Sequence, residues 1–280
     1  MERFCFHIDG TAFEFPTSQP ADFQYGQNEV LSNAQTDITY GQPWYEKGFT
    51  THEVLDKRSF ALLLEAVTTC VSKVISSQLN IDTKGFTLTQ YHTYVTSDEA
   101  HYQVIRQTRD LYLKNLQIPV ADLFHHFETS LGFAVTDIDP QTNEAIYVII
   151  RINRPGSGDF NPPHKDVYHF TDGGAAYLPQ FVNIWIPICG VNELSSLPLV
   201  PHSHLLPESK LLRTVSGGVI GKNTYNVRMI KDWDGSNTLQ RAQVQEGEAL
   251  FFTPHLIHGL AVNQQENTTR VSLEFRLFRK

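Results

Sequence analysis

Two short segments of this chain carry residues suited to binding a metal ion. The first, His164-Lys165-Asp166, follows a turn-rich stretch of Gly, Asn and Pro at residues 156–163. Side chains two positions apart in an extended segment point to the same face, so one ion can contact both His164 and Asp166. The second, His7-Ile8-Asp9, lies near the start of the chain with nothing around it to build a pocket. We therefore place the site at the first segment, with a structural hydrogen-bonded pair as the alternative.

A third ligand is expected from the segment that follows a predicted strand at residues 249–253. His258 is the candidate and His255 its rival. Two histidines and one carboxylate that leave three positions open form the arrangement associated with non-haem Fe(II) oxygenases. The open positions would allow 2-oxoglutarate to chelate the iron and O₂ to bind next.

The last predicted strand, Thr269–Leu277, separates polar from apolar residues by alternation. Its apolar face would pack under helices, and its polar face would meet either solvent or the interior of a barrel. In the second case Arg270 suits the distal carboxylate of 2-oxoglutarate, since a guanidinium offers paired donors and the Ser272 hydroxyl adds another. Arg276 is the alternative anchor on the same face. The four polar residues are Arg270, Ser272, Glu274 and Arg276.

Other polar residues fall where predicted strands and loops approach this site. The predicted strand Phe181–Ile188 places Asn183 and Trp185 on one face, where we expect contacts with the co-substrate, although Trp185 also suits plain core packing. The loop after the first metal segment has flexible glycines at 173–174 that a lid would use. Candidates for contact with substrate or co-substrate are Arg151, Asn153 and Tyr168.

The elements that must position these residues fall into two parts of one catalytic domain spanning residues 1–280. In residues 1–140, helices are expected at Asp56–Leu79, Asp98–Leu116 and Val120–Leu131, the last stopped by Gly132. From residue 145 to 280, short strands separated by turns favour an antiparallel barrel or jelly roll. These strands are expected at Ala145–Arg154, Phe181–Ile188, Ala249–Thr253 and Thr269–Leu277. We expect the first part to pack on the barrel.

At this point the sequence resembles a known family, the Fe(II)/2-oxoglutarate-dependent dioxygenases, and within it the phytanoyl-CoA dioxygenase-like branch. The resemblance covers roughly residues 151–276, and that branch often has a Pro-Gly-Ser-His turn, where this chain has His202 in place of Gly. The motifs that carry it are His164-x-Asp166, Trp185-x-Pro187, Pro201-His202-Ser203-His204, Gly247-Glu248-Ala249-Leu250-Phe251-Phe252, His258-Gly259 and Arg270-Val271-Ser272.

The resemblance implies a mainly β fold with flanking helices around a double-stranded β-helix, the jelly-roll form also seen in cupins. It implies that His164, Asp166 and His258 hold Fe(II), and that Arg270 and Ser272 bind 2-oxoglutarate. The family reaction converts 2-oxoglutarate and O₂ to succinate and CO₂ while an unactivated C–H bond is oxidised, usually by hydroxylation. Related halogenases have a small residue at the position of Asp166, so the carboxylate argues against halogenation.

Composition limits the partners that we expect. The formal net charge of −8 argues against nucleic acid and slightly favours a neutral or cationic small-molecule substrate. No stretch approaches the 18 or so consecutive apolar residues of a membrane span, and the first ten residues do not resemble a secretory signal. The 3 scattered cysteines suggest reduced thiols and a cytoplasmic location.

Oligomeric state is not indicated. A metal-dependent cupin that does not use 2-oxoglutarate and a non-catalytic jelly-roll binding module remain the alternatives.

Overall fold

The computed structural model describes residues 3–16, 21–109, 111–112, 120–170, 178, 180–220 and 223–280. Its main sheet consists of six strands, which are β4 (Phe49–Glu53), β5 (Val135–Thr136), β6 (Ile149–Asn153), β7 (Phe181–Cys189), β14 (Glu248–Phe252) and β15 (Arg270–Arg279). The order is β4-β14-β7-β15, and β5 and β6 both pair with β15. Every pairing in this sheet is antiparallel.

A second layer is assembled from two smaller sheets. One has the order β2-β1-β13-β8 and the other β12-β9-β3, and β10 and β11 form a separate hairpin. Single-residue bridges join the two sheets, since His258 pairs with both Leu199 and His164, and the Ile230 amide donates to the Pro163 carbonyl at 2.7 Å. The strands are β1 (Arg3–Ile8), β2 (Thr11–Pro16), β3 (Phe23–Tyr25), β8 (Pro198–Leu199), β9 (Leu211–Thr214), β10 (Gly218–Ile220), β11 (Asn223–Tyr225), β12 (Ile230–Trp233) and β13 (Thr238–Arg241).

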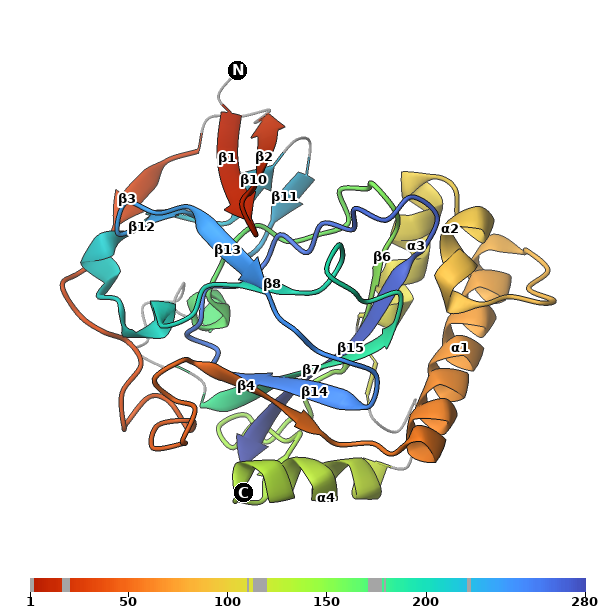
Figure 1. Cartoon of the computed structure of the whole chain (residues 1–280), viewed down its shortest axis with the longest axis horizontal. Helices are drawn as coiled ribbons and strands as arrows, with labels where there is room; N and C mark the ends of the chain where they lie inside the picture. The colour runs from red at the N-terminus through yellow and green to blue at the C-terminus, as the bar shows by residue number, and fades with distance from the viewer. Residues whose placement is uncertain are drawn as a thin grey trace.

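The two layers form the jelly roll expected from the sequence (Figure 1). A cavity lies between them, lined on one side by main-sheet residues such as Trp185 and Arg270 and on the other by His164 and His258. The metal-binding segments thus occupy the middle of the second layer, where regular pairing is reduced to single bridges.

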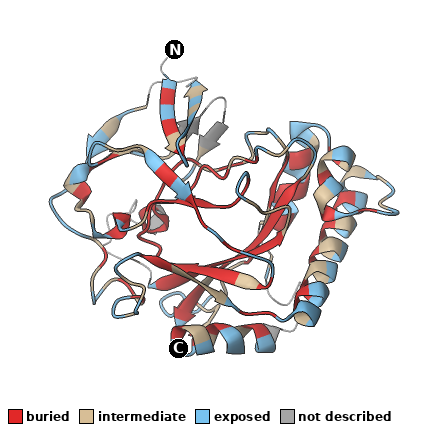
Figure 2. Cartoon of the chain, in the orientation of Figure 1, coloured by how far each residue is buried: buried red, intermediate tan, exposed pale blue. Residues whose placement is uncertain are grey.

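Alternation along β15 gives the main sheet two different faces. Val271, Leu273 and Phe275 are buried on the face that packs against the helices (Figure 2). Arg270 and Ser272 are also fully buried, but on the opposite face, towards the second layer. The polar side of this strand therefore faces the barrel interior and not solvent.

Helices cover the outer face of the main sheet. The first, α1 (Lys57–Leu79), begins at Asp56, whose side chain accepts a hydrogen bond from the Ser59 amide at 2.7 Å. Among the helices of the described residues, α1 alone is long and apolar enough, by length and composition, to cross a membrane. One side of α1 is buried in the core that it shares with β7 and β15. The others are α2 (Tyr91–Tyr94), α3 (Asp98–Thr108), α4 (Val120–Leu131) and the 3-10 turns η1 (Leu88–Gln90), η3 (Asp166–Phe170), η4 (Ser203–Leu205) and η5 (Glu208–Lys210).

The expected elements are present with shifted ends. The helix predicted over Asp98–Leu116 ends earlier, at Thr108, and its predicted end lies outside the described residues, as do the glycines at 173–174. The strand predicted from Ala145 begins at Ile149. The first 140 residues do more than pack on the barrel, because β4 and β5 extend the main sheet and β1 pairs in parallel with β13.

The backbone accommodates His202 at the turn position where the resemblance leads us to expect glycine. His202 has φ of 64°, in the left-handed region that favours glycine. Its amide donates to the Lys47 carbonyl at 3.1 Å, and its Nδ1 donates to the Glu46 carbonyl at 2.8 Å. The turn geometry is thus retained, and these two hydrogen bonds hold His202 in it.

Candidate metal centre

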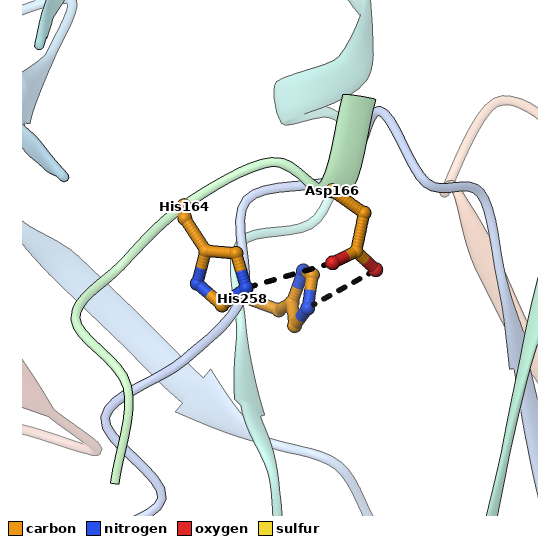
Figure 3. A group of neighbouring side chains, drawn as sticks. All are labelled: His164, Asp166 and His258. Atoms are coloured by element: carbon orange, nitrogen blue, oxygen red, sulfur yellow. Dashed lines mark ion pairs between the residues drawn. The ribbon is translucent and has the colours of Figure 1, made fainter. Parts of the chain in front are cut away.

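Three buried side chains from two distant segments meet at one point inside the barrel. The amide of His164 donates to the His258 carbonyl at 2.9 Å and the reverse bond is 3.1 Å, so the two histidines are paired across the second layer. Asp166, two residues after His164, begins the turn η3. The Nε2 atom of His164 lies 3.6 Å from Asp166 Oδ1, and that of His258 lies 3.7 Å from Oδ2 (Figure 3). All three ligand atoms lie within 4.8 Å of one another.

The hydrogen bonds of both histidines prepare Nε2 for a metal. His164 Nδ1 donates to the Pro162 carbonyl at 2.7 Å, and His258 Nδ1 donates to the Leu256 carbonyl at 3.0 Å. A ring that donates through Nδ1 keeps a lone pair on Nε2 when it is neutral. Burial, followed by the neighbouring His164, lowers the pKa of His258 to about 4, which favours the neutral form. Two neutral imidazoles and a carboxylate fit Fe(II).

Asp166 is fixed by a hydrogen bond to each carboxylate oxygen. Asn183 Nδ2 donates to Oδ2 at 2.7 Å, and the Arg276 guanidinium donates to Oδ1 at 2.9 Å. Burial alone would raise the pKa of Asp166, but Arg276 and the neighbouring histidines outweigh it and hold that pKa well below its usual value. The carboxylate is therefore ionised and oriented before any metal binds.

Arg270 provides buried donors that have no hydrogen-bond partner in the part of the chain that the structure describes. One terminal nitrogen donates to Asn153 Oδ1, and the guanidinium carbon lies 5.0 Å from the centre of the Trp185 ring. Its Nε and other terminal nitrogen, the Ser272 hydroxyl and the Trp185 indole nitrogen are buried without a hydrogen-bond partner among the described residues. Unpaired buried donors are costly, so the free donors of Arg270 and Trp185, which both line the cavity, are suited to an anionic ligand. The distal carboxylate of 2-oxoglutarate fits this donor set.

The cavity that contains these groups is about 740 Å³, counting the space open to solvent. It is lined by the metal triad and by Asn153, Asn183, Trp185 and Arg270. Arg151 and Glu274 also line it, joined by two hydrogen bonds of 3.1 and 2.8 Å. The predicted contacts Arg151 and Asn153 are thus brought to the site.

The structure places three of the candidate residues outside the lining of the cavity. Tyr168 does not line the cavity, because its hydroxyl donates to Glu208 Oε2 at 2.6 Å in a separate buried cluster. The rival ligand His255 points away from the triad, and its Nε2 donates to the Thr36 carbonyl at 3.3 Å. Ser272 lies beside Arg270 in the strand but is not among the cavity-lining residues.

Sequence reasoning missed two functional roles. The sequence suggests Arg276 only as the alternative anchor for 2-oxoglutarate, whereas in the structure Arg276 donates to the Asp166 carboxylate. Glu274 was given no role, yet it pairs with Arg151 inside the cavity. Both residues lie on the polar face of the last strand. The alternation of polar and apolar residues in that strand is the sequence feature that indicates their position.

A jelly roll that holds a buried two-histidine, one-carboxylate triad beside unpaired arginine donors defines a mononuclear non-haem metal enzyme. A family model described as phytanoyl-CoA dioxygenase (PhyH) matches residues 54–270. The chain belongs to the phytanoyl-CoA dioxygenase family. It is accordingly an oxygenase that uses Fe(II) and 2-oxoglutarate, and the triad described above has the residue types and spacing to hold the iron.

Two solved structures are similar to the chain, and the first of them supports the fold. EctD from S. alaskensis, crystallised with 2-oxoglutarate and 5-hydroxyectoine, has a TM-score of 0.51 and 14% identity, covering 95% of this chain and 86% of that one. AviO1 from Streptomyces viridochromogenes Tue57 has a TM-score of 0.46 and 15% identity, covering 89% and 96%. No curated protein sequence matches the chain.

Proposed function

We propose that this oxygenase oxidises an unactivated C–H bond of a small metabolite, with hydroxylation as the reaction and succinate and CO₂ as co-products. The observation that carries the proposal is the pairing of a preorganised His164–Asp166–His258 triad with the unpaired donors of Arg270 in one cavity. The lining of this cavity mixes apolar side chains with a few polar and charged groups, as is usual in sites that bind small molecules.

The side chains have separable roles. His164, Asp166 and His258 would hold Fe(II), which supplies oxidation by O₂ coupled to decarboxylation of 2-oxoglutarate. Arg270 would bind the distal carboxylate of 2-oxoglutarate, and Asn153 keeps the guanidinium in place through its Oδ1. Asn183 and Arg276 hold Asp166 at both oxygens. The carboxylate occupies the position that a halide would need, which supports hydroxylation over halogenation.

Part of the cavity lining is apolar. Phe160, Leu197 and Phe252 line it together with the polar groups. Such side chains exclude water from the reacting centre and provide contact for the carbon skeleton of a substrate.

The test is a pair of binding measurements without O₂. Fe(II) and then 2-oxoglutarate are added to the apoprotein, and the visible charge-transfer band of the chelate is recorded for the wild type and for Arg270→Ala. We expect a band in the wild type and a weaker band in the variant at limiting 2-oxoglutarate. Iron binding without a band would favour a cupin chemistry that does not use 2-oxoglutarate.

A second variant tests the metal ligand. Asp166→Ala should remain folded but lose Fe(II) affinity and iron-dependent succinate release, because it removes the one anionic ligand. Retained turnover in this variant would place the metal site elsewhere, and absence of iron binding by the wild type would support a non-catalytic binding module.

A further inference from the structure

The charges that line the cavity differ in sign from the charge of the whole chain. The chain carries a formal net charge of −8. The cavity is lined by three guanidinium groups and two carboxylates, which leaves one net positive charge when the histidines are neutral. Fe(II) adds two positive charges and the 2-oxoglutarate dianion removes two, so the loaded cavity still carries one positive charge. The lining groups are Arg151, Arg270, Arg276, Asp166 and Glu274.

The arrangement of these groups indicates where an additional anion would bind. Arg276 is committed to Asp166, and the free donors of Arg270 suit 2-oxoglutarate. Arg151 donates from Nε to Glu274 Oε1 at 3.1 Å and from one terminal nitrogen to Oε2 at 2.8 Å. Its remaining terminal nitrogen has no hydrogen-bond partner among the described residues, and 15% of the side chain is exposed.

The same pair disfavours a cation. Both oxygens of Glu274 already accept hydrogen bonds from Arg151, so the guanidinium compensates the negative charge of this carboxylate and would repel an ammonium group beside it. An anion instead meets N–H groups of Arg151 that are still free. Burial alone would raise the pKa of Glu274, but Arg151 beside it lowers that pKa, so the pair stays ionised.

We propose that the Arg151–Glu274 pair recognises the charge of the substrate, and that the substrate is a small organic acid whose carboxylate binds Arg151 while its carbon skeleton contacts the apolar lining. This inference rests on the proposed function and specifies the substrate class for the same cavity. It reverses the preference for a neutral or cationic substrate that the acidic composition suggests. Charges inside the cavity lie closer to the substrate and are screened less by water and salt than the charges on the protein surface.

The experiment uses three probes with one skeleton: hexanoate, hexanamide and hexylamine. Each is titrated without O₂ into protein loaded with Fe(II) and saturating 2-oxoglutarate, and binding is followed by calorimetry and by the change in the visible band. We expect hexanoate to bind about tenfold more tightly than hexanamide, and hexylamine to bind more weakly than both.

Two substitutions should move the preference in opposite directions. Arg151→Gln should abolish the preference for hexanoate, whereas Glu274→Gln should increase it by releasing Arg151. Because Arg151→Gln leaves a buried carboxylate unpaired, the double variant Arg151→Gln/Glu274→Gln serves as a second test, with the same loss of preference and no unpaired charge. Arg106→Gln, at an exposed position outside the cavity, is the matched control and should change nothing.

Each other outcome has a defined meaning. A wild-type protein without the charge-transfer band would contradict the proposed function itself. A normal band with equal affinity for the three probes, or without hexanoate binding, would overturn the inference alone. A rise in the Kd of 2-oxoglutarate in Arg151→Gln, with the probe preference unchanged, would assign Arg151 to the co-substrate and would also overturn it.

Discussion

Replacing Arg270 by methionine should affect stability and ligand binding in different ways. In the apoprotein this guanidinium is fully buried, and its Nε and one terminal nitrogen have no partner among the described residues. Burial lowers the pKa of Arg270 to about 10, which reflects the cost of the charge in this position. Arg270→Met keeps an apolar stem of similar length and removes that cost.

The expected magnitudes follow from the hydrogen bonds. Each unpaired buried donor costs about 1–3 kcal/mol in the apoprotein, and the substitution removes that cost. This gain offsets the loss of the hydrogen bond to Asn153 and of the contact with Trp185, so the apoprotein should lose no stability. Two charge-assisted hydrogen bonds to a carboxylate contribute about 1.5–3 kcal/mol each, so 2-oxoglutarate should bind roughly 100- to 20,000-fold more weakly.

Thermal unfolding of the apoprotein, and of the protein with Mn(II) in the presence and absence of 2-oxoglutarate, measures both effects. In the wild type, 2-oxoglutarate at 100 times its Kd should stabilise the fold by about 2.7 kcal/mol, and in Arg270→Met this gain should disappear at the same concentration. A variant that loses more than about 2 kcal/mol of apoprotein stability but binds 2-oxoglutarate normally would refute the assignment, because Arg270 would then be a structural residue.

Three further predictions concern other parts of the structure. Asn183→Leu should weaken Mn(II) binding by roughly 10- to 100-fold in calorimetry, since it removes one of the two hydrogen bonds that orient Asp166. Gly259→Ala should lower both the Tm and the metal affinity, because Gly259 has φ of 135° and an added Cβ atom would lie 2.4 Å from the Pro162 backbone oxygen. An unchanged Tm would contradict this prediction. Burial lowers the pKa of His101 from 6.5 to about 4, so the unfolded state binds the proton more readily and stability should fall by up to roughly 3 kcal/mol as pH drops from 6.5 to 4. Chemical denaturation across this range should show a smaller fall for His101→Gln, and the full fall for the exposed control His126→Gln.

The features readable from the sequence are those that depend on local periodicity. Alternation in Thr269–Leu277 correctly separated the helix-facing residues from those facing the cavity. The spacing of His164 and Asp166 predicts that both side chains lie on one side of an extended segment, and the structure brings the third candidate, His258, beside them. The helix at Val120–Leu131 also has its predicted ends.

The features not readable from the sequence depend on pairing between distant strands. Arg276 reaches Asp166 because Arg276 pairs with Asn183 in the register between β15 and β7, and Asn183 itself bonds that carboxylate. Arg151 reaches Glu274 through the register between β6 and β15. A shift of one residue would turn each side chain to the other face, and a single sequence does not reveal which register the strands adopt.

The segment around Lys165 explains why Tyr168 was assigned to the wrong surroundings. Lys165 lies between two metal ligands that face the cavity, so its side chain points the opposite way, where it is fully buried and donates to Glu208 Oε1 at 2.8 Å. A lone buried ammonium group would cost on the order of several kcal/mol, so Lys165 depends on this partner. Tyr168 donates to the other oxygen of Glu208 at 2.6 Å, which fixes the carboxylate that holds Lys165. Tyr168 thus supports the metal-binding segment from behind, and the alternation that directs His164 and Asp166 to the metal also requires the buried ion pair on the other side.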